Sequence, residues 1–446
     1  MPRPLPRPRL RGAAAVFTTL SALAATSQVT GPSIAEPLAA PPCALARTDA
    51  HHSEGLDTWN AAYPRPDRTL DAVMVFLSFP DARPATTPAE LAADHFPVTS
   101  QYFARASYGK FRLRAHPLPQ WIRMPRPSAD YAIQRDWTPR HRAAYLRDAL
   151  AAVDDRVDFS RYDVVYFVAD PDAPGVDSDA TKVVNLERPL RADGTDIRRV
   201  VTVFEQHPPD RLVLAHETGH VFDLPDLYHR PSDGRGDWDT YVGDWDLMGS
   251  QFGMAPDLFA WHKWKLGWLE PRQVVCVRGD EPVRLTLESL GAGPGAVPVA
   301  GAAGATGGAA GAWAGSTGAG AGPTGAGGGA AGVRPGRGIK LAVVRTGPDT
   351  VLAFEARGAV GNDRTACRQG VLVYRVHSGE ESGGGPVQVI DAHPRTEACW
   401  ENSVYPPLAD APVGVGESFA VPGEDVRVEV EGRTATGAWT VRISPA

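Results

Sequence analysis

Hydrophobic runs of strand length alternate with helix-like segments in the first half of the chain. Three of these runs contain few polar residues: 70–79, 162–169 and 199–204. Such continuous runs predict buried strands. Three other segments have the pattern of a helix: 100–111, which ends near Gly109, 139–157 and 255–268. Strands that alternate with helices indicate an α/β (α+β) domain, here residues 67–270, around a mostly buried sheet.

Beyond Pro271 the pattern changes to short β-rich runs separated by turn residues. The runs are 283–287, 339–344, 351–356, 370–376 and 426–430. We therefore expect residues 271–446 to form a β-rich, sandwich-like domain. Within it, residues 291–336 are predominantly Gly and Ala. Such a segment has too little side-chain surface to offset the cost of ordering its backbone, so it predicts a disordered, flexible insertion without chemistry.

The N-terminus has the three-part layout of a secretory signal peptide. A leader with several arginines precedes an apolar run over 12–25, and small residues then offer a cleavage site near residue 27. We expect residues 1–27 to be this signal and the mature protein to be secreted to the extracellular space. The apolar run is too short to span a bilayer, and no cysteine follows it in a lipid-attachment context, which predicts no membrane anchor. Residues 28–66 are then an N-terminal arm or a pro-segment.

Charge and cysteine content narrow the class further. The net charge is −7 and the basic residues are scattered, which argues against a nucleic-acid partner. Four cysteines in an exported chain favour two disulfides over unpaired buried thiols. We predict that Cys367 pairs with Cys399, closing a short loop, and that Cys43 pairs with Cys276, tying the N-terminus to the β-rich half.

His216, Glu217 and His220 form the pattern expected of a zinc site on a helix. The two histidines are four residues apart, so their imidazoles leave the same helix face one turn apart. We expect Asp210 to cap this helix. Glu217 can accept a proton from the attacking water as a general base. The same triplet also occurs by chance on helix surfaces, so the neighbouring residues decide between the two interpretations.

The residues that follow supply a third ligand and a supporting turn. Pro225 ends the helix, and Asp226 emerges ten residues after His216. This offset resembles that of metzincin-type sites, where it places the third zinc ligand. Downstream, Asp246-Leu-Met-Gly249 is similar to the turn that carries the structural methionine of that clan, here Met248.

Together, HETGHVFDLPDLY and GDWDLMGSQFG resemble the immune inhibitor A family of secreted bacterial metallopeptidases. Three further segments are similar to that family: SQYFARASYGKF, APDLFAWHKWKLGWL and VLAFEARGAVGNDRTACRQGVLVYRV. The resemblance implies a metzincin-like catalytic domain, a β-rich companion domain and broad proteolysis of extracellular proteins. It also implies an inhibitory N-terminal segment, for which residues 28–66 are the candidate.

Asp223 departs from the family pattern, because the usual residue at this eighth motif position is glycine. Glycine is favoured where the chain takes a left-handed turn, and aspartate tolerates that turn better than most residues. The departure leaves Asp223 as a rival to Asp226 for the third ligand.

Two aspartate-rich loops could bind calcium. The first contains Asp170, Asp172, Asp177 and Asp179, and the second contains Asp233, Asp237, Asp239 and Asp244. Neither loop has the spacing of an EF-hand, and solvated turn residues are the alternative explanation.

The sequence thus predicts a secreted zinc metalloendopeptidase that holds one catalytic Zn²⁺ and hydrolyses protein or peptide substrates. The alternative is a catalytically silent binding or adhesion protein on the same scaffold. Glu217 favours the enzyme, because a silent scaffold has no need of a general base.

Overall fold

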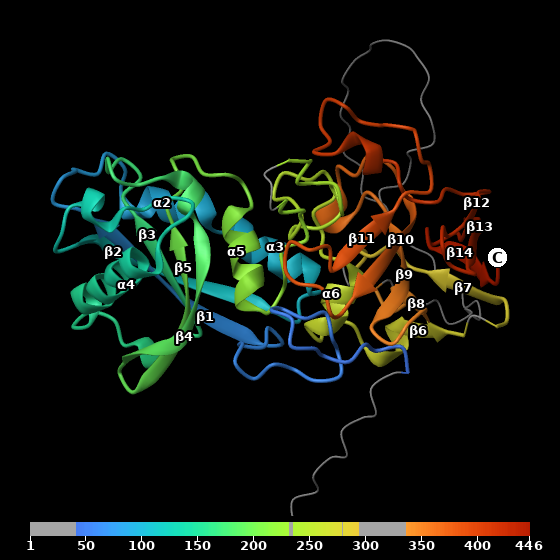
Figure 1. Cartoon of the computed structure of the whole chain (residues 1–446), viewed down its shortest axis with the longest axis horizontal. Helices are drawn as coiled ribbons and strands as arrows, with labels where there is room; N and C mark the ends of the chain where they lie inside the picture. The colour runs from blue at the N-terminus through green and yellow to red at the C-terminus, as the bar shows by residue number, and fades with distance from the viewer. Residues whose placement is uncertain (1–41, 232–234, 279, 294–335) are drawn as a thin grey trace, which may run out of the picture. The chain divides into compact units, whose positions relative to one another are not determined.

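The computed structural model describes residues 42–231, 235–278, 280–293 and 336–446 (Figure 1). They belong to one compact unit, Pro41–Ala446, with a mixed α/β fold. The expected signal peptide, residues 28–41 of the expected arm and most of the Gly/Ala-rich segment lie outside the described residues.

The first half is built on a five-stranded sheet in the order β2-β1-β3-β5-β4. Its strands are β1 (Thr69–Ser78), β2 (Arg112–Arg123), β3 (Val164–Ala169), β4 (Lys182–Ala192) and β5 (Thr195–Val203). The first four strands in this order run parallel, whereas β4 pairs antiparallel with β5 at the edge, with Val183 opposite Val201.

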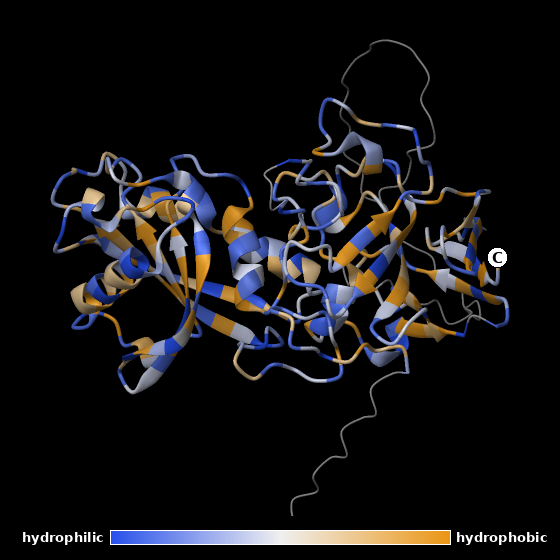
Figure 2. Ribbon diagram, viewed as in Figure 1, coloured by the Kyte–Doolittle hydropathy of each residue, from blue (hydrophilic) through white to orange (hydrophobic). Residues whose placement is uncertain are grey.

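Both faces of this sheet are covered, which explains the continuous hydrophobic runs (Figure 2). Met74 and Phe76 of β1 belong to the core shared with α2 (Pro88–His95), α3 (Val98–Ala106) and α5 (Val213–Val221). The alternate residues Val73, Val75 and Leu77 pack against α4 (Pro139–Val153) on the other face. The predicted strands and the helix over 139–157 are confirmed within a few residues at their ends.

The second half contains two further sheets, in the orders β11-β10-β9-β8-β6 and β12-β13-β14-β7. Their strands are β6 (Val274–Val277), β7 (Val283–Leu287), β8 (Leu341–Arg345), β9 (Thr350–Arg357), β10 (Gly370–His377), β11 (Val387–Ile390), β12 (Ser418–Ala420), β13 (Arg427–Arg433) and β14 (Trp439–Ser444). The sheets share a core that includes Leu352 and Phe354 from one and Val428 and Val441 from the other. The predicted β-rich character of this half is confirmed.

One hydrophobic core continues across the expected boundary at residue 270. Leu341 and Tyr374, on the second face of the β11-β10-β9-β8-β6 sheet, belong to the same cluster as Trp261 and Trp268, from and beside α6 (Ala260–Lys265). Short 3-10 helices complete the elements: η1 (Ser128–Tyr131), η2 (Phe159–Arg161), η3 (Ser178–Ala180), η4 (Pro271–Gln273), η5 (Gly361–Asp363) and η6 (Pro406–Leu408).

Several sequence-based details are wrong. The helix predicted over 255–268 is only α6, because its apolar residues reflect burial against a sheet rather than helical periodicity. Asp210 does not cap α5, which begins at Val213 without a side-chain cap. The strands β2 and β4 were not predicted, because edge strands lack a continuous hydrophobic run.

The structure pairs Cys43 with Cys276 and Cys367 with Cys399, so the predicted disulfides are confirmed. The paired Cα atoms are 5.6 and 6.1 Å apart, within the range that a disulfide spans. None of the helices in the described ranges is long and apolar enough to cross a membrane.

Candidate metal centre

The helix α5 and the turn after it carry all the predicted ligands. Every residue of α5 is buried, between the first sheet and the β-rich half (Figure 1). The helix ends at Val221, Phe222 is its C-cap, and Asp223 then takes a left-handed conformation with φ 66°. The amide of Leu224 then donates to Gly219 O at 3.2 Å, and Pro225 cannot continue the helix. This reversal brings Asp226 back to face the histidines.

His216, His220 and Asp226 converge on one point. Asp226 Oδ1 lies 3.4 Å from His216 Nε2 and 3.0 Å from His220 Nε2. The potential ligand atoms all lie within 4.8 Å of one another, and no other group of three such side chains occurs in the described part of the chain. Two imidazole nitrogens and a carboxylate oxygen are a donor set that suits Zn²⁺ with an open fourth position.

Backbone carbonyls fix the direction in which each histidine points. His216 Nδ1 donates to Leu247 O, and His220 Nδ1 donates to Leu224 O, each at 2.8 Å. Because a carbonyl only accepts, the proton lies on Nδ1, and Nε2 of the neutral ring offers its lone pair to the centre. This is the arrangement by which proteins orient histidine ligands.

The electrostatics of the centre favour a cation. Asp226 Oδ1 is buried, and its polar neighbours at the centre are the Nε2 atoms of His216 and His220. Burial alone would lower the pKa of His220, but the Asp226 carboxylate outweighs burial and raises it to about 9. Burial would raise the pKa of Asp226, but the two histidines hold it well below its usual range. Without a metal, a proton on His220 Nε2 balances the Asp226 carboxylate. A divalent metal ion at the same point would displace this proton and take over its role, so the residues fit such an ion.

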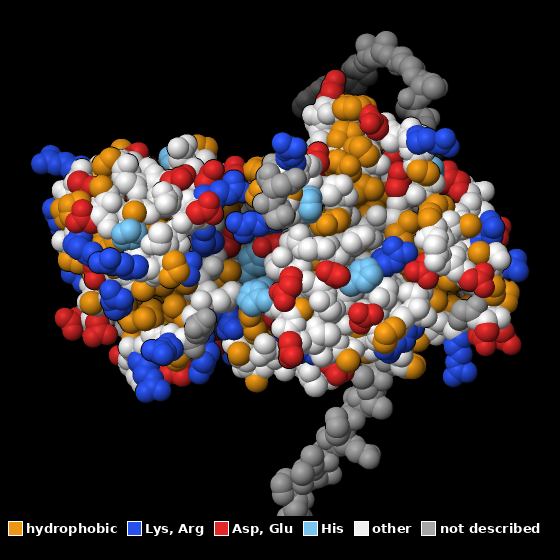
Figure 3. Space-filling model, viewed as in Figure 1, with side chains coloured by type: hydrophobic (Ala, Val, Ile, Leu, Met, Phe, Trp, Pro, Cys, Tyr) orange, Lys and Arg blue, Asp and Glu red, His pale blue; other side chains and the backbone are white. Residues whose placement is uncertain are grey.

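Glu217 lies beside the centre and outside the ligand group. Its Oε2 accepts a hydrogen bond from the Val183 amide of β4 at 2.7 Å, and burial raises the pKa of its carboxyl group. It lines two adjoining cavities of about 310 and 410 Å³. His52, Lys182 and Arg230 also line the smaller cavity, while Glu205, Asp239 and Phe252 also line the larger. Figure 3 shows histidine and acidic side chains exposed together in the depression between the part that carries β1 and the part that carries β10.

Met248 lies directly against α5. A Cβ at Gly219 would come within 2.4 Å of Met248 Sδ, so only glycine at this position allows such a close approach. The methionine is buried in a tight turn, in which its amide donates to Asp246 Oδ1 at 2.7 Å and the Gly249 amide donates to Asp246 O at 3.0 Å. The turn thereby supports the helix that carries His216 and His220.

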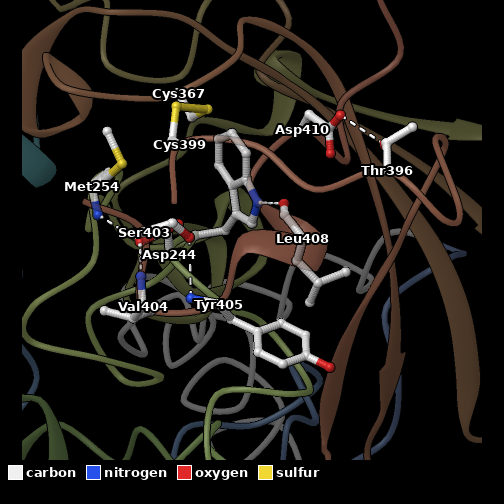
Figure 4. The surroundings of a disulfide bond; sticks show 11 residues. Asp244, Met254, Cys367, Thr396, Cys399, Ser403, Val404, Tyr405, Leu408 and Asp410 are labelled. Carbon is white, nitrogen blue, oxygen red and sulfur yellow. Dashed lines mark hydrogen bonds between the residues drawn. A yellow bond between two sulfur atoms is a disulfide. The ribbon is translucent and has the colours of Figure 1, made fainter. Parts of the chain in front are cut away.

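The Cys367–Cys399 disulfide holds the loop that anchors this turn (Figure 4). Asp244 accepts hydrogen bonds from the Met254 and Val404 amides and from Ser403 Oγ, at 3.0, 3.2 and 2.5 Å. Asp244 therefore links the loop at Met254 to the loop at Ser403 and Val404.

The structure keeps Asp223 away from the centre. Its carboxylate accepts from His52 Nδ1 at 2.9 Å and pairs with Arg47, and it is fully buried. The left-handed turn expected at this position is present, but Asp223 does not belong to the convergent group.

The two aspartate-rich loops do not assemble a comparable group in the described ranges. Asp170 and Asp172 accept backbone amides of Asp172 and Ala85, and Asp177 accepts the Asp179 amide. These are the contacts of turn residues. Asp233 of the second loop lies outside the described residues.

Sequence reasoning missed three neighbours of the centre. Arg47 and His52 precede the motif by more than 160 residues, and Ser382 follows it at a similar distance. Ser382 Oγ accepts the Asp226 amide at 2.8 Å and lies 3.2 Å from Asp226 Oδ2. The one available signal was Asp223, since a buried aspartate in place of a glycine requires a cationic or hydrogen-bonding partner.

Neither a protein-family model nor a curated protein matches this chain.

Proposed function

We propose that the chain is a secreted, zinc-dependent endopeptidase that hydrolyses proteins or peptides. The observation that supports this most directly is the convergence of His216, His220 and Asp226 with Glu217 beside them at the border of two cavities. The three ligands would hold Zn²⁺, which when bound polarises the scissile carbonyl and lowers the pKa of the attacking water. The resemblance to immune inhibitor A peptidases points the same way.

Glu217 is the proposed general base. It borders both cavities and follows His216 directly, so a water molecule at the open position of the centre would be within its reach. Glu217 would accept a proton from this water and later donate it to the leaving amine. No covalent intermediate with the protein is needed in this reaction.

The edge strand β4 is the proposed binding site for the substrate backbone. It is the last strand of its sheet, and Thr181, Lys182, Val183 and Asn185 line the smaller cavity. The Val183 amide points to Glu217 rather than to β5. An extended peptide can pair with such an edge through main-chain hydrogen bonds, which would place its scissile bond beside Glu217.

Secretion is supported by the two disulfides, which persist in oxidising compartments, and by the signal-like leader.

The test is cleavage of casein and of a fluorogenic peptide library by the purified protein, with and without 1,10-phenanthroline. We expect cleavage that the chelator abolishes and that added Zn²⁺ restores. A protein that binds zinc but leaves every substrate intact would instead be the silent binding protein, and the proposal would be withdrawn.

A further inference from the structure

Residues 43–66, here called the strap, are an integral part of the folded unit. Cys43 joins the strap to Cys276, and Glu54 is fully buried. Two tryptophans donate to strap carbonyls: Trp261 Nε1 to Glu54 O at 3.1 Å and Trp268 Nε1 to Pro66 O at 2.7 Å. Removing the strap would therefore expose a core and leave buried polar groups without partners.

The strap contacts the turn whose backbone carbonyl orients the ligand His220. The carbonyl that orients His220 belongs to Leu224, and the residue before it is Asp223. Arg47 and His52 of the strap bind the Asp223 carboxylate. Lys265 Nζ completes the contact by donating to Asp223 O at 2.6 Å and to His52 O at 3.3 Å.

A buried chain of ion pairs leads from the strap to the turn at Met248, whose backbone orients the ligand His216. Glu54 Oε1 lies 2.8 Å from His262 Nε2, and His262 Nδ1 lies 3.1 Å from Asp246 Oδ2. Asp246 precedes Leu247, whose carbonyl orients His216. Glu54, His262 and Asp246 are all fully buried, so water does not weaken these contacts.

The strap also reaches the loop that holds Asp226. The His51 amide donates to Glu381 Oε2 at 3.0 Å, and Ser53 Oγ donates to Ser378 O at 2.7 Å. The next residues of that loop bind Asp226, through Ser382 Oγ and through the Gly383 amide, which donates to Asp226 O at 3.0 Å.

The three contacts share one geometry. In each case the strap binds the residue immediately before the one that orients a ligand: Asp223 before Leu224, Asp246 before Leu247 (through His262) and Glu381 before Ser382. We propose that the strap positions the three metal ligands, with Arg47 and Glu54 as positioning residues, and is not a removable inhibitory segment. This inference rests on the proposed metal site.

The geometry also argues against inhibition. An inhibitory segment would either place a ligating side chain into the centre or fill the cavity, and the convergent group contains no strap residue. His51 and His52 form one wall of the smaller cavity, and the cavity of about 310 Å³ remains beside them. The strap therefore borders the cavity without filling it.

A strap that positions the ligands and a strap that inhibits the enzyme predict opposite changes in peptidase activity for Arg47→Met. If the strap positions the ligands, the zinc affinity, measured by competition with a chromogenic chelator, should fall roughly tenfold, because supporting partners typically contribute 10–100-fold. Peptidase activity at limiting zinc should fall with it. Arg47→Lys, which keeps the charge, should recover part of the affinity. Arg65→Met is the matched control, since Arg65 lies on the same strap in an exposed ion pair with Asp67.

A zinc affinity of Arg47→Met equal to that of the wild type, with only a lower melting temperature, would overturn the proposal, as would higher activity. If this variant does not fold, Glu54→Gln replaces it, with an expected loss of roughly tenfold in zinc affinity. A wild-type protein that binds zinc but cleaves nothing contradicts only the proposed peptidase, because the affinity comparison still decides the role of the strap. A wild-type protein that binds no zinc overturns both.

Discussion

The candidate centre combines two regions that are built in different ways. The three ligands and Glu217 come from the single stretch 216–226. One of the groups that orient those ligands, the Leu224 carbonyl, belongs to the same stretch. The others come from the turn at Met248 and the loop over 378–384, and the strap contacts the residues that precede them, so most of the support is far away in the sequence. The identity of the ligands is thus a local property, whereas their orientation is a tertiary one. Substitutions in 216–226 should change the chemistry, and substitutions in the supporting segments should change affinity and stability.

The largest effect is expected within 216–226, where metal binding and chemistry can be separated. Glu217→Ala keeps all three ligands, so it should retain zinc, but the loss of the general base should lower the rate by roughly a hundredfold to ten-thousandfold. Asp226→Ala should lose zinc and activity together, because two imidazoles alone hold the ion weakly. Metal content and peptide cleavage are measured on both variants: Glu217→Ala should contain zinc without cleaving peptides, and Asp226→Ala should do neither.

Asp223→Ala is the control for the choice of third ligand. Its carboxylate faces Arg47 and His52, so at saturating zinc the variant should hold as much metal as the wild type. The opposite pattern, in which Asp223→Ala loses zinc while Asp226→Ala keeps it, would assign the third ligand to Asp223.

A smaller effect is expected from His262, which links the strap to the turn at Met248. Burial would lower the pKa of His262, but Glu54 and Asp246 raise it from 6.5 to about 9. Because the folded-state pKa lies above the unfolded one, this stabilisation is complete below pH 6.5 and is lost as the pH rises through 9. Its upper limit is about 3 kcal/mol.

The measurement is chemical denaturation of the wild type and of His262→Gln at pH 6 and pH 9. The wild type should be less stable at pH 9, and the variant, which cannot titrate at this position, should lose the part of that difference that His262 contributes, while the part from His220 stays in both proteins. His207→Gln is the control, since His207 is paired with Asp94 on the surface. An unchanged pH dependence in His262→Gln would show that the network does not titrate in this way.

A still smaller effect is expected where the turn touches α5. Gly219→Ala would drive a methyl group into Met248 Sδ, and such overpacking typically costs about 1–3 kcal/mol. Because both changes act on one contact, Gly219→Ala combined with Met248→Ala should cost less than the sum of the single variants. Denaturation of the four proteins measures this coupling. Gly432→Ala is the control, since a Cβ there meets nothing within 4 Å, and additive effects at 219 and 248 would refute the contact.

The same contrast explains what could be predicted from the sequence. The strands β1, β3 and β5 were predictable because burial on both faces gives continuous hydrophobic runs, whereas the edge strands β2 and β4 have polar residues and prolines. The ligand spacing was readable because helical periodicity fixes which side chains share a face. The contacts of Arg47 and Glu54 were not, because an isolated charged residue in an irregular segment carries no periodicity that would identify its partner.

The smallest effect is expected from the Gly/Ala-rich segment, which is distant in sequence from 216–226 like the strap but consists mainly of Gly and Ala. Its two ends are already joined: Gly336 and Gly338 donate to the Glu288 carboxylate, and Lys340 Nζ donates to Ala292 O at 2.6 Å. A short Gly-Ser linker in place of 294–335 should therefore span the gap. Loop-closure entropy changes by only about 0.6 kcal/mol for each halving of length, in the stabilising direction. The melting temperature should stay constant or rise slightly and peptidase activity should not change, so a large fall in either would show that the segment packs against the folded unit.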